Sequence, residues 1–570
     1  MAILYRIKKI SFKTVIIWMI LSAVFLFAIV PITDGDTGYH LKTGQYIVEH
    51  KTVPLYDIFT YTAQGARWVA HYWLSDVFFY LVYLLSGMWG LILFVALIAA
   101  FTYWILYKAG RLNGISRTAM SIVLGLFAAF LIKIWSEWVV RPQIFGFLMA
   151  AVLIYILEKW RLTKKRKFLI CSIPILISWA NLHASVVLGI AILGLYVGLS
   201  VLRNLRKFSV WKFDAFIGIA AVFSTLLNPN GYRVLIYSYT IAPAVKLVGI
   251  FEWRSIIEYL GPNGSPKAPY VFGFMCLAVA VVLWQLLISF KESKRDFNWE
   301  WLFLTVAAFI LPIISVRHVE LFPIMGFLGI AWSVDRIISK YISAHKFERI
   351  LSAALVILGV VLIISGISGI PSQALGISQL PEGAAEFILK NKLSEPIFNT
   401  ISQGSYLIWK LWPEYKVFID GRSEVFPLDV WKEFNTVDEF GVGWKDVFDK
   451  YKFNTIVLTG TVPKPGDKLV GAELILAYTL TQKYDYSLVY WDDASLVIVK
   501  NNPLNAGIIK KFGYSVIGPY ITPQLIPQSQ AVAAAKEIQR AMEISPDSQN
   551  LKIYLQSFLD YHQKIDLLSY

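Results

Sequence analysis

Charged residues and cysteines are both scarce in this chain of 570 residues. Asp, Glu, Lys and Arg make up 16% of it, against 57% for hydrophobic residues, a balance that excludes an ordinary soluble globular protein. The two cysteines, Cys171 and Cys276, lie in hydrophobic stretches. The sequence therefore supports neither a disulfide framework nor a zinc-binding cluster.

Long hydrophobic runs fill the first two thirds of the chain. Each is close in length to the ~20 residues that a helix needs to cross the hydrocarbon layer. Lipid offers backbone polar groups no hydrogen-bond partner, so these runs must form helices, whose backbone groups bond to one another. The formal net charge of +15 raises the question of nucleic acid, but Lys and Arg cluster in short loops between the runs. Positive cytoplasmic loops have this pattern, so we predict a multi-pass protein of the plasma (inner) membrane without a nucleic-acid partner.

The basic loops also orient the predicted spans. The first span, residues 14–32, follows a basic flank and precedes no small-residue cleavage site, so we predict a retained helix with a cytoplasmic N-terminus. Residues 33–87 then form an outer loop, in which residues 68–86 are a helix lying against the membrane and not a span. About eleven transmembrane helices result. The other spans are predicted at residues 88–107, 118–134, 143–158, 168–183, 185–202, 212–228, 270–290, 301–316, 319–336 and 350–371.

The composition changes after the last predicted span. We predict a membrane domain at residues 1–372, an extracytoplasmic α/β domain at 373–505 and a short helical hairpin, similar to a single repeat, at 525–566. The predicted strands are residues 396–399, 417–420, 455–458, 487–491 and 496–500, and the predicted helices are residues 382–393, 405–412 and 444–451.

Two polar segments of this domain follow predicted strands. Residues Asp420 to Glu424 form either an ion-paired turn or a binding site for acceptor or sugar, and the turn is the favoured interpretation. Asp492 and Asp493 predict a hairpin turn between two β runs.

The acidic segment Asp34-Gly35-Asp36 comes directly after the first span. Carboxylates at an apolar boundary suit proton abstraction because partial desolvation makes them stronger bases, and an Asp-x-Asp pair can hold a divalent cation. A solvated turn is the other interpretation, since Asp-Gly is common in turns. Asp34 and Asp36 are therefore candidates for a catalytic base and, together, for a metal site.

The alternation of spans places further polar residues on the same outer side. Ionisable groups at membrane helices are costly and are functional candidates. Each has a structural alternative, because arginines can anchor helix ends to headgroups and Asn or His can cap and bridge neighbouring helices. The candidates are Glu137, Arg141, Asn181, His183, Arg233, Glu252, Arg317 and His318, together with His40 and His71 of the first outer loop.

Several motifs together resemble the GT-C superfamily of membrane glycosyltransferases. DGDTGYHLKTGQYI, followed by a membrane-lying helix, resembles its first outer loop, and SEWVVRPQ resembles its second. Seven spans before a larger outer loop at residues 229–269 resemble its shared module. WANLH, NPNGYR and VFIDGR further resemble uncharacterised bacterial members that carry an outer α/β domain.

This resemblance implies a reaction. A sugar would move from a polyprenyl-phosphate donor to a glycan, lipid or protein acceptor on the outer face, with inversion at the anomeric carbon. Asp36 or Asp34 would deprotonate the acceptor hydroxyl, and Arg141, Arg317 and His183 would bind the departing phosphate. Branches of the superfamily differ in metal use, so the resemblance leaves a divalent ion open and implies no other cofactor.

Two other hypotheses remain. A transporter is disfavoured, because the sequence has no obvious repeat and no span with a charge at its centre. A non-catalytic assembly or binding protein would use the outer domain and the terminal hairpin as a docking surface. Such a protein would lose its function on deletion of residues 373–570 but not on substitution of the aspartates.

Overall fold

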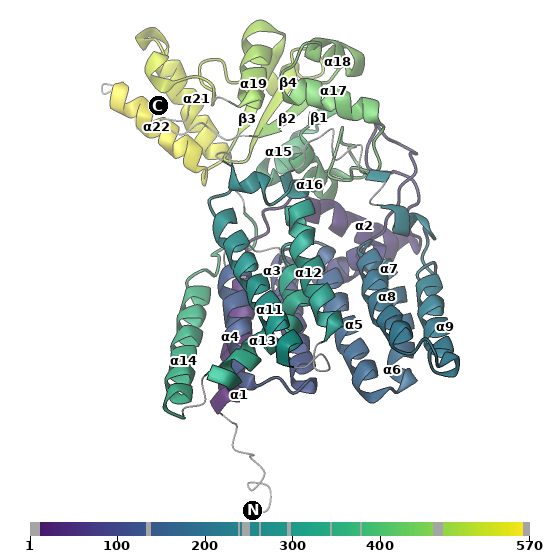
Figure 1. The fold of residues 1–570 in the computed structure, drawn as a ribbon. Helices are drawn as coiled ribbons and strands as arrows, with labels where there is room; N and C mark the ends of the chain where they lie inside the picture. Colours follow the sequence, from purple (N-terminus) through teal and green to yellow (C-terminus); the bar gives the residue numbers. More distant parts are fainter. Residues whose placement is uncertain are drawn as a thin grey trace, which may run out of the picture. The chain divides into compact units, whose positions relative to one another are not determined.

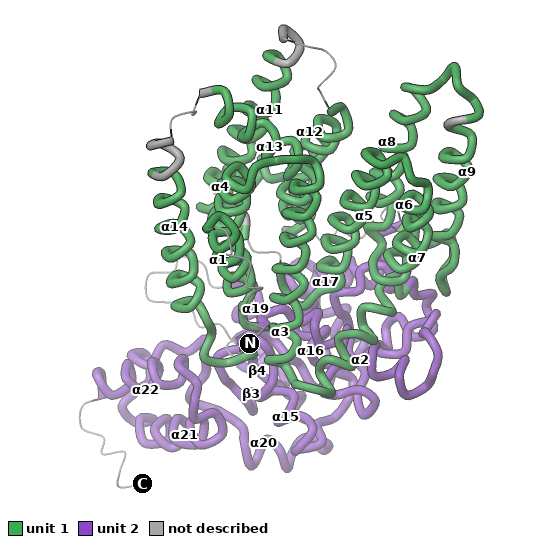
Figure 2. Tube along the Cα trace, turned by 90° about the horizontal axis from the view of Figure 1, so that it is seen from below, with its two compact units in different colours: residues 1–31, 70–239, 249–374 green, residues 32–69, 240–248, 375–570 purple. Residues whose placement is uncertain are grey.

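The computed structural model describes residues 12–132, 138–237, 240–241, 251–261, 264–292, 298–341, 345–376, 379–459 and 471–562. The chain divides into two compact units, which Figure 2 shows in different colours. The first comprises residues 1–31, 70–239 and 249–374, and the second comprises residues 32–69, 240–248 and 375–570. Each unit thus combines segments that are distant in the sequence.

The first unit consists of helices that run side by side (Figure 1). In chain order they are α1 (Phe12–Phe27), α3 (Trp73–Leu112), α4 (Arg117–Phe127), α5 (Gln143–Thr163), α6 (Arg166–Ile170), α7 (Ser172–Leu182), α8 (Val186–Arg203), α9 (Phe208–Ser224), α11 (Ala268–Glu292), α12 (Trp299–Ile314), α13 (Leu321–Tyr341) and α14 (His345–Ile367). A short π-helical stretch, Ala128–Ile132, extends α4. Helix α3 packs against α1 and α5, and α12 packs against α13.

Every predicted span coincides with helical residues of this unit. Within the described residues, six helices are long and apolar enough to cross a membrane: Trp73–Leu112, Gln143–Thr163, Val186–Arg203, Ala268–Ile288, Leu321–Lys340 and Ile350–Ile367. Three shorter apolar helices are Phe12–Phe27, Arg117–Phe130 and Trp299–Ile314. These helices give a multi-pass membrane protein, and the number of about eleven crossings stays a prediction.

A glycine divides the longest helix where the sequence predicted a boundary. Gly87 has φ +63° and ψ −158°, so α3 is two helices joined by a kink. A positive φ is open to glycine because it has no Cβ. The predicted separation of residues 68–86 from the span at 88–107 is confirmed. The earlier helix begins at Trp73 and not at Trp68, because the Trp68 amide bonds to the Leu55 carbonyl at 2.9 Å and residues 71–72 form a turn.

The second unit contains a four-stranded sheet in the order β1-β2-β4-β3. Its strands are β1 (Ile397–Asn399), β2 (Thr455–Thr459), β3 (Tyr486–Trp491) and β4 (Ser495–Lys500), with β1 parallel to β2 and the other pairs antiparallel. Phe398 pairs with Ile456, and Ile456 pairs with Ile498. The apolar run of β4 is buried on both faces, as expected of a central strand.

The second unit also contains helices outside the sheet (Figure 1). They are α2 (Asp36–His50), α15 (Glu382–Asn391), α16 (Ile401–Leu411), α17 (Leu428–Asp438), α18 (Trp444–Tyr451), α19 (Ala472–Lys483) and α20 (Ala506–Phe512). The predicted terminal hairpin corresponds to α21 (Ala531–Ile544) and α22 (Gln549–Tyr561).

One predicted strand, residues 417–420, is wrong. Val417 forms only an isolated bridge with Thr60, and the segment bonds to a side chain instead of a neighbouring strand. Asn399 Oδ1 accepts from the Phe418 amide at 2.8 Å, and Asn399 Nδ2 donates to the Ile419 carbonyl at 2.7 Å. These bonds satisfy the buried backbone that a sheet would otherwise have satisfied.

The turn between β3 and β4 is confirmed as a hairpin turn and has a second role. Asp492 Oδ1 accepts from the amides of Ala494 and Ser495 at 2.8 and 2.7 Å. Asp493 accepts from the Gln549 amide at 2.8 Å and from the Ser548 hydroxyl at 2.7 Å, at the N-terminus of α22. The turn therefore fastens the terminal helical hairpin to the sheet.

Residues 32–69, here called the first-loop segment, belong to the same unit as residues 375–570. Helix α2 packs on α16 through glycines: a Cβ on Gly35 would lie 2.0 Å from the Ser402 carbonyl oxygen, and one on Gly38 would lie 2.5 Å from that of Ser405. The placement of both segments on the outer side of the membrane stays a prediction.

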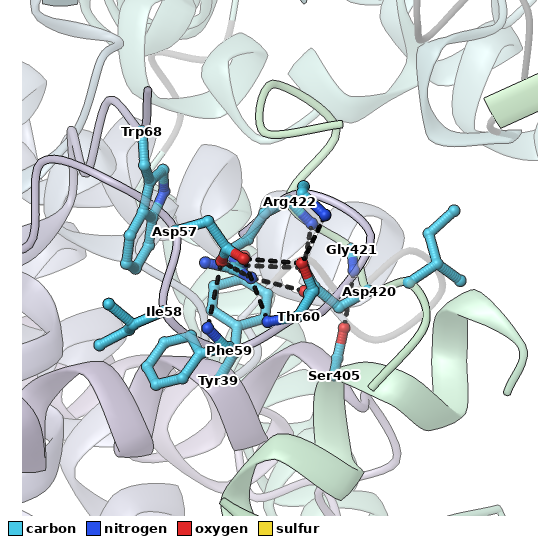
Figure 3. Close-up of polar contacts among 12 residues, drawn as sticks. Tyr39, Asp57, Ile58, Phe59, Thr60, Trp68, Ser405, Asp420, Gly421 and Arg422 are labelled. Atoms are coloured by element: carbon cyan, nitrogen blue, oxygen red, sulfur yellow. Dashed lines mark hydrogen bonds and ion pairs between the residues drawn. The ribbon is translucent and has the colours of Figure 1, made fainter. Parts of the chain in front are cut away.

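A buried arginine joins the first-loop segment to the C-terminal part (Figure 3). Arg422 bonds to Asp420 through Nε at 2.9 Å and Nη2 at 2.6 Å, and its Nη2 also bonds to Asp57 Oδ1 at 2.7 Å. All three side chains are 0% exposed. The guanidinium lies 4.5 Å from the ring centroid of Trp68 and 5.0 Å from that of Phe59. The ion-paired interpretation of residues 420–424 is confirmed.

Replacing this arginine tests its contribution to stability. In Arg422→Leu, Asp57 and Asp420 lose their shared cation while buried, and breaking a buried pair in this way costs about 3–5 kcal/mol. We expect a clearly lower midpoint of thermal unfolding for the purified protein in detergent. The control is Lys445→Ala, which removes an exposed ion pair with Asp449 and should leave the midpoint unchanged. Equal midpoints for the two variants would contradict the role assigned to Arg422.

Candidate active site

The two aspartates of the acidic segment have different surroundings at the start of α2. Asp34 Oδ1 accepts a hydrogen bond from the Asp36 amide at 3.1 Å. The first amides of a helix lack partners within the helix, so Asp34 satisfies one of them. Asp36 is the first residue of α2.

A hydroxyl from the C-terminal part contacts the Asp36 carboxylate. Ser405, in α16, donates from Oγ to Asp36 Oδ1 at 2.9 Å, and the same Oγ accepts from the Gly421 amide at 2.9 Å. Figure 3 shows Ser405 directed at Gly421. The sequence did not identify Ser405, because an internal serine of an amphipathic helix carries no local signal of function. His40, one turn along α2, is 3% exposed, and its ring lies 4.2 Å from that of Tyr39.

The predicted divalent-cation site at Asp34 and Asp36 stays a prediction. Among the described residues, no group of three His, Cys, Asp or Glu side chains could hold a metal ion. One oxygen of Asp34 bonds the backbone of Asp36, and one oxygen of Asp36 bonds Ser405. Neither bond excludes a divalent ion, because a carboxylate has two oxygens that can accept or coordinate, and no step of the chemistry is assigned to such an ion.

The first unit gathers another set of predicted residues, here called the basic cluster: Arg141, His183, Glu252, Arg317 and His318. Arg141 Nη1 bonds to both carboxylate oxygens of Glu252, at 2.6 and 2.8 Å. Burial raises the pKa of Glu252, but Arg141 and Arg317 outweigh it and the pKa is lowered. Glu252 is therefore ionised and neutralises Arg141.

Arg317 has a different environment in this cluster. Its Nη2 donates to Gln143 Oε1 at 3.2 Å, and its guanidinium lies 5.6 Å from the ring centroid of Trp253. Within the part of the chain that the structure describes, no carboxylate forms an ion pair with Arg317. Its charge therefore lacks a direct counter-ion among these residues.

The two histidines of the cluster are neutral at physiological pH. Burial, with the charges of Arg317 and His318, lowers the pKa of His183 from 6.5 to about 3. Burial and Arg317 lower the pKa of His318 to about 4. His183 Nδ1 accepts from the Ser185 amide at 3.1 Å, so the proton of the neutral ring lies on Nε2. His183 can therefore donate a hydrogen bond without a positive charge.

The other predicted residues have more ordinary surroundings. Asn181 accepts from Trp73 Nε1 at 2.9 Å and donates to the Leu227 carbonyl at 2.9 Å, so it bridges neighbouring segments as its structural alternative expected. His71 is 5% exposed, and its ring lies 5.7 Å from that of His183. Arg233 is exposed and lies over its neighbour Tyr232. Glu137 lies outside the described residues.

The lowered pKa of His183 predicts a pH dependence of stability. The pKa of His183 is 6.5 in the unfolded chain and about 3 in the folded chain. The contribution of the neutral His183 ring to stability is therefore fully present above pH 6.5 and is lost as the pH falls. We expect the midpoint of thermal unfolding to fall less steeply in His183→Gln than in the wild type as the pH decreases from 6.5 towards 4. The exposed His50→Gln variant is the control. An unchanged pH profile in His183→Gln would show that His183 is not the titrating group.

Comparisons with known proteins find likeness in structure only. No protein-family model matches the chain, and no curated protein matches it in sequence. The Archaeoglobus fulgidus oligosaccharyltransferase tethered with an acceptor peptide containing the NVT sequon is similar at a TM-score of 0.54 and 12% identity, over 87% of this chain and 75% of that chain. The same protein in complex with Zn and sulfate is similar at a TM-score of 0.53 and 12% identity, over 87% of this chain and 74% of that chain.

A third structure extends the likeness over nearly the whole chain. The archaeal oligosaccharyltransferase AglB from Archaeoglobus fulgidus, in complex with an inhibitory peptide and a dolichol-phosphate, gives a TM-score of 0.54 at 10% identity, over 97% of this chain and 86% of that chain. At such identities the likeness concerns the fold. This chain is therefore a multi-pass membrane protein whose fold is similar to that of the archaeal oligosaccharyltransferase.

Proposed function

We propose that the chain is an inverting membrane glycosyltransferase that moves a sugar from a polyprenyl-phosphate donor to an acceptor on the outer face. The observation that carries this proposal is the partly buried hydrogen bond that orients the Asp36 carboxylate at the start of α2, in a chain with the GT-C fold. A solvated turn would not require a dedicated donor for this carboxylate.

The surroundings of the two aspartates favour Asp36 as the general base. One oxygen of Asp34 is engaged by the Asp36 amide, which is a helix-capping role. Asp36 is held by a side chain from α16, 369 residues away in the sequence. A base must be held within hydrogen-bond reach of the proton that it abstracts, so a fixed carboxylate suits this role better than a capping one.

Arg317 is the best candidate for stabilising the leaving phosphate. Glu252 already neutralises Arg141 by two short bonds, whereas Arg317 has no ion pair among the described residues. A guanidinium offers several donors in a plane that matches phosphate oxygens. His183, neutral with its proton on Nε2, would add a hydrogen bond without competing for charge.

The proposed reaction is a single displacement. Asp36 takes the proton of the acceptor hydroxyl as its oxygen attacks the anomeric carbon of the donor. The bond between that carbon and the phosphate oxygen breaks on the opposite face, which inverts the configuration. The developing negative charge on the polyprenyl phosphate is stabilised by Arg317, while Arg141 is paired with Glu252. No metal is needed to balance these steps.

The related structures support the substrate classes. AglB forms a complex with a dolichol-phosphate, and the tethered structure holds an acceptor peptide. We propose a polyprenyl-phosphate-linked sugar as the donor and a protein, glycan or lipid as the acceptor. The first-loop segment and residues 375–570, which fold as one unit, would both lie outside the cytoplasm, with the N-terminus inside.

Substitution of the two aspartates tests the base. The probe is the tritium-labelled polyprenyl-phosphate sugar fraction extracted from host membranes, and the measurement is transfer of label to water-soluble or protein-bound product. Asp36→Asn keeps the shape but removes the base, so we expect the rate to fall by about 10²–10⁴-fold. The rate of the Asp34→Asn variant, which keeps a side-chain oxygen that can accept from the Asp36 amide, should fall much less. Full activity in both single variants and in the double variant would refute the proposed function.

Substitution of Arg317 tests the phosphate site. Arg317→Ala removes charge stabilisation of the leaving group, and we expect kcat to fall by about 10²–10³-fold in the same assay. Arg317→Lys should recover part of this loss, because it restores a point charge without the planar fork. The exposed cation Lys267→Ala is the control. If Arg317→Ala transfers sugar as fast as the Lys267 control, another group stabilises the phosphate.

A further inference from the structure

A two-step hydrogen-bond chain runs from the backbone after the α16 helix to the Asp36 carboxylate. The Gly421 amide donates to Ser405 Oγ at 2.9 Å, and Ser405 Oγ donates to Asp36 Oδ1 at 2.9 Å. Ser405 is fully buried, so water does not compete for its hydroxyl.

The direction of the Ser405 hydroxyl follows from its neighbours. A hydroxyl has one proton, and its other acceptor within reach is the Ile401 carbonyl at 3.4 Å. A bond of 2.9 Å to a carboxylate is shorter and charge-assisted, so it is the stronger of the two. The Gly421 amide occupies a lone pair of the same oxygen and leaves the proton for Asp36.

The backbone around the carboxylate leaves it little freedom to move. A Cβ on Gly421 would lie 2.2 Å from Asp36 Oδ1 and 3.0 Å from its Cγ. On the other side, Gly35 and Gly38 bring the first turn of α2 against the backbone of α16. A carboxylate is planar, so fixing Oδ1 between a hydroxyl and a backbone also fixes the direction of its second oxygen.

We propose that Ser405 and the Gly421 amide are positioning groups that hold the general base in its productive orientation, so that residues 375–570 complete the catalytic centre of the first-loop segment. This proposal rests on the proposed function of Asp36. Packing and orientation depend on different groups. The glycines allow α2 to pack on α16, whereas the Ser405 hydroxyl bonds to the Asp36 carboxylate and the Gly421 amide. Loss of the hydroxyl therefore affects the orientation of the base more than the fold.

The segment Asp420-Gly421-Arg422 contributes to this chain of contacts by holding the Gly421 amide in place. Arg422 follows Gly421 in the sequence, and it bonds to Asp420, which precedes Gly421, and to Asp57. The ion network thus holds the donor that orients Ser405, and Ser405 orients Asp36. A misplacement of about 1 Å of a catalytic group costs on the order of 10²-fold in rate, so rigid support of this kind affects turnover.

The test compares two substitutions of the same shape. Ser405→Thr keeps the hydroxyl and Ser405→Val replaces it with a methyl group, so any packing strain is common to both. In the transfer assay with the tritium-labelled lipid-linked sugar fraction, we expect kcat to fall by about 10–100-fold in Ser405→Val and by less than about threefold in Ser405→Thr. The apparent KM for the lipid-linked sugar should stay within about twofold in both, because the hydroxyl does not bind the donor.

Three further variants make the result decisive. Ser402→Ala, an exposed serine one turn from Ser405 on the same helix, should have wild-type kcat. Gly421→Ala places a methyl group against the Asp36 carboxylate and should lower kcat at least as much as Ser405→Val. If Ser405→Val does not accumulate in the membrane, Ser405→Ala replaces it, since alanine removes the hydroxyl without adding bulk.

The outcomes separate the two proposals. Asp36→Asn is measured alongside, and its full activity would overturn the proposed function itself. If Asp36→Asn is inactive but the valine and threonine variants have equal kcat, the positioning role of Ser405 is overturned while the base stands. A loss in Ser405→Val that resides in KM would likewise overturn it. A loss in kcat alone, recovered in Ser405→Thr, supports it.

Discussion

One guanidinium shared by two buried carboxylates holds the second unit together. Arg422 lies between Asp420 and Asp57 with all three side chains fully buried, and its charge is offset by both. Such a group costs several kcal/mol to desolvate and is tolerated only when its donors are satisfied and its geometry is good. The Arg422 guanidinium bonds both carboxylates through Nε and Nη2 and lies near the rings of Trp68 and Phe59. This interaction joins residues 32–69 to residues 375–570, together with the packing of α2 on α16.

The close approach of these two helices has a chemical consequence. Glycines at positions 35, 38 and 421 remove the side chains that would keep the backbones apart, so a hydroxyl from one segment can reach a carboxylate of the other. A catalytic base on a loop beside a membrane would otherwise sample several orientations, at a cost in rate. Under the proposed function, the C-terminal α/β part would provide this support through Ser405 and the Gly421 amide.

The two arginines of the basic cluster in the first unit have different electrostatic environments. Glu252 neutralises Arg141 and lowers the local positive charge, while Arg317 keeps a charge without a direct partner among the described residues. That charge and burial keep His183 and His318 neutral. One available cation beside neutral hydrogen-bond donors is an environment in which a single phosphate can bind without leaving a surplus of buried positive charge after it departs.

Local patterns in the sequence determined the membrane helices, four of the five predicted strands, the boundary at Gly87 and the turn at Asp492 and Asp493, because hydrophobic run length, alternation and turn chemistry act over a few residues. Helices α2, α17, α19 and α20 were not predicted, and residues 417–420 were taken for a strand, because the partners of these segments are set by tertiary contacts. Asp36 was identified from its position beside an apolar helix. Its partner Ser405 is 369 residues away, and Arg422 is 365 residues from Asp57. No periodicity links residues at such distances, so only the packing of α2 against α16 decided which aspartate is held and by which group.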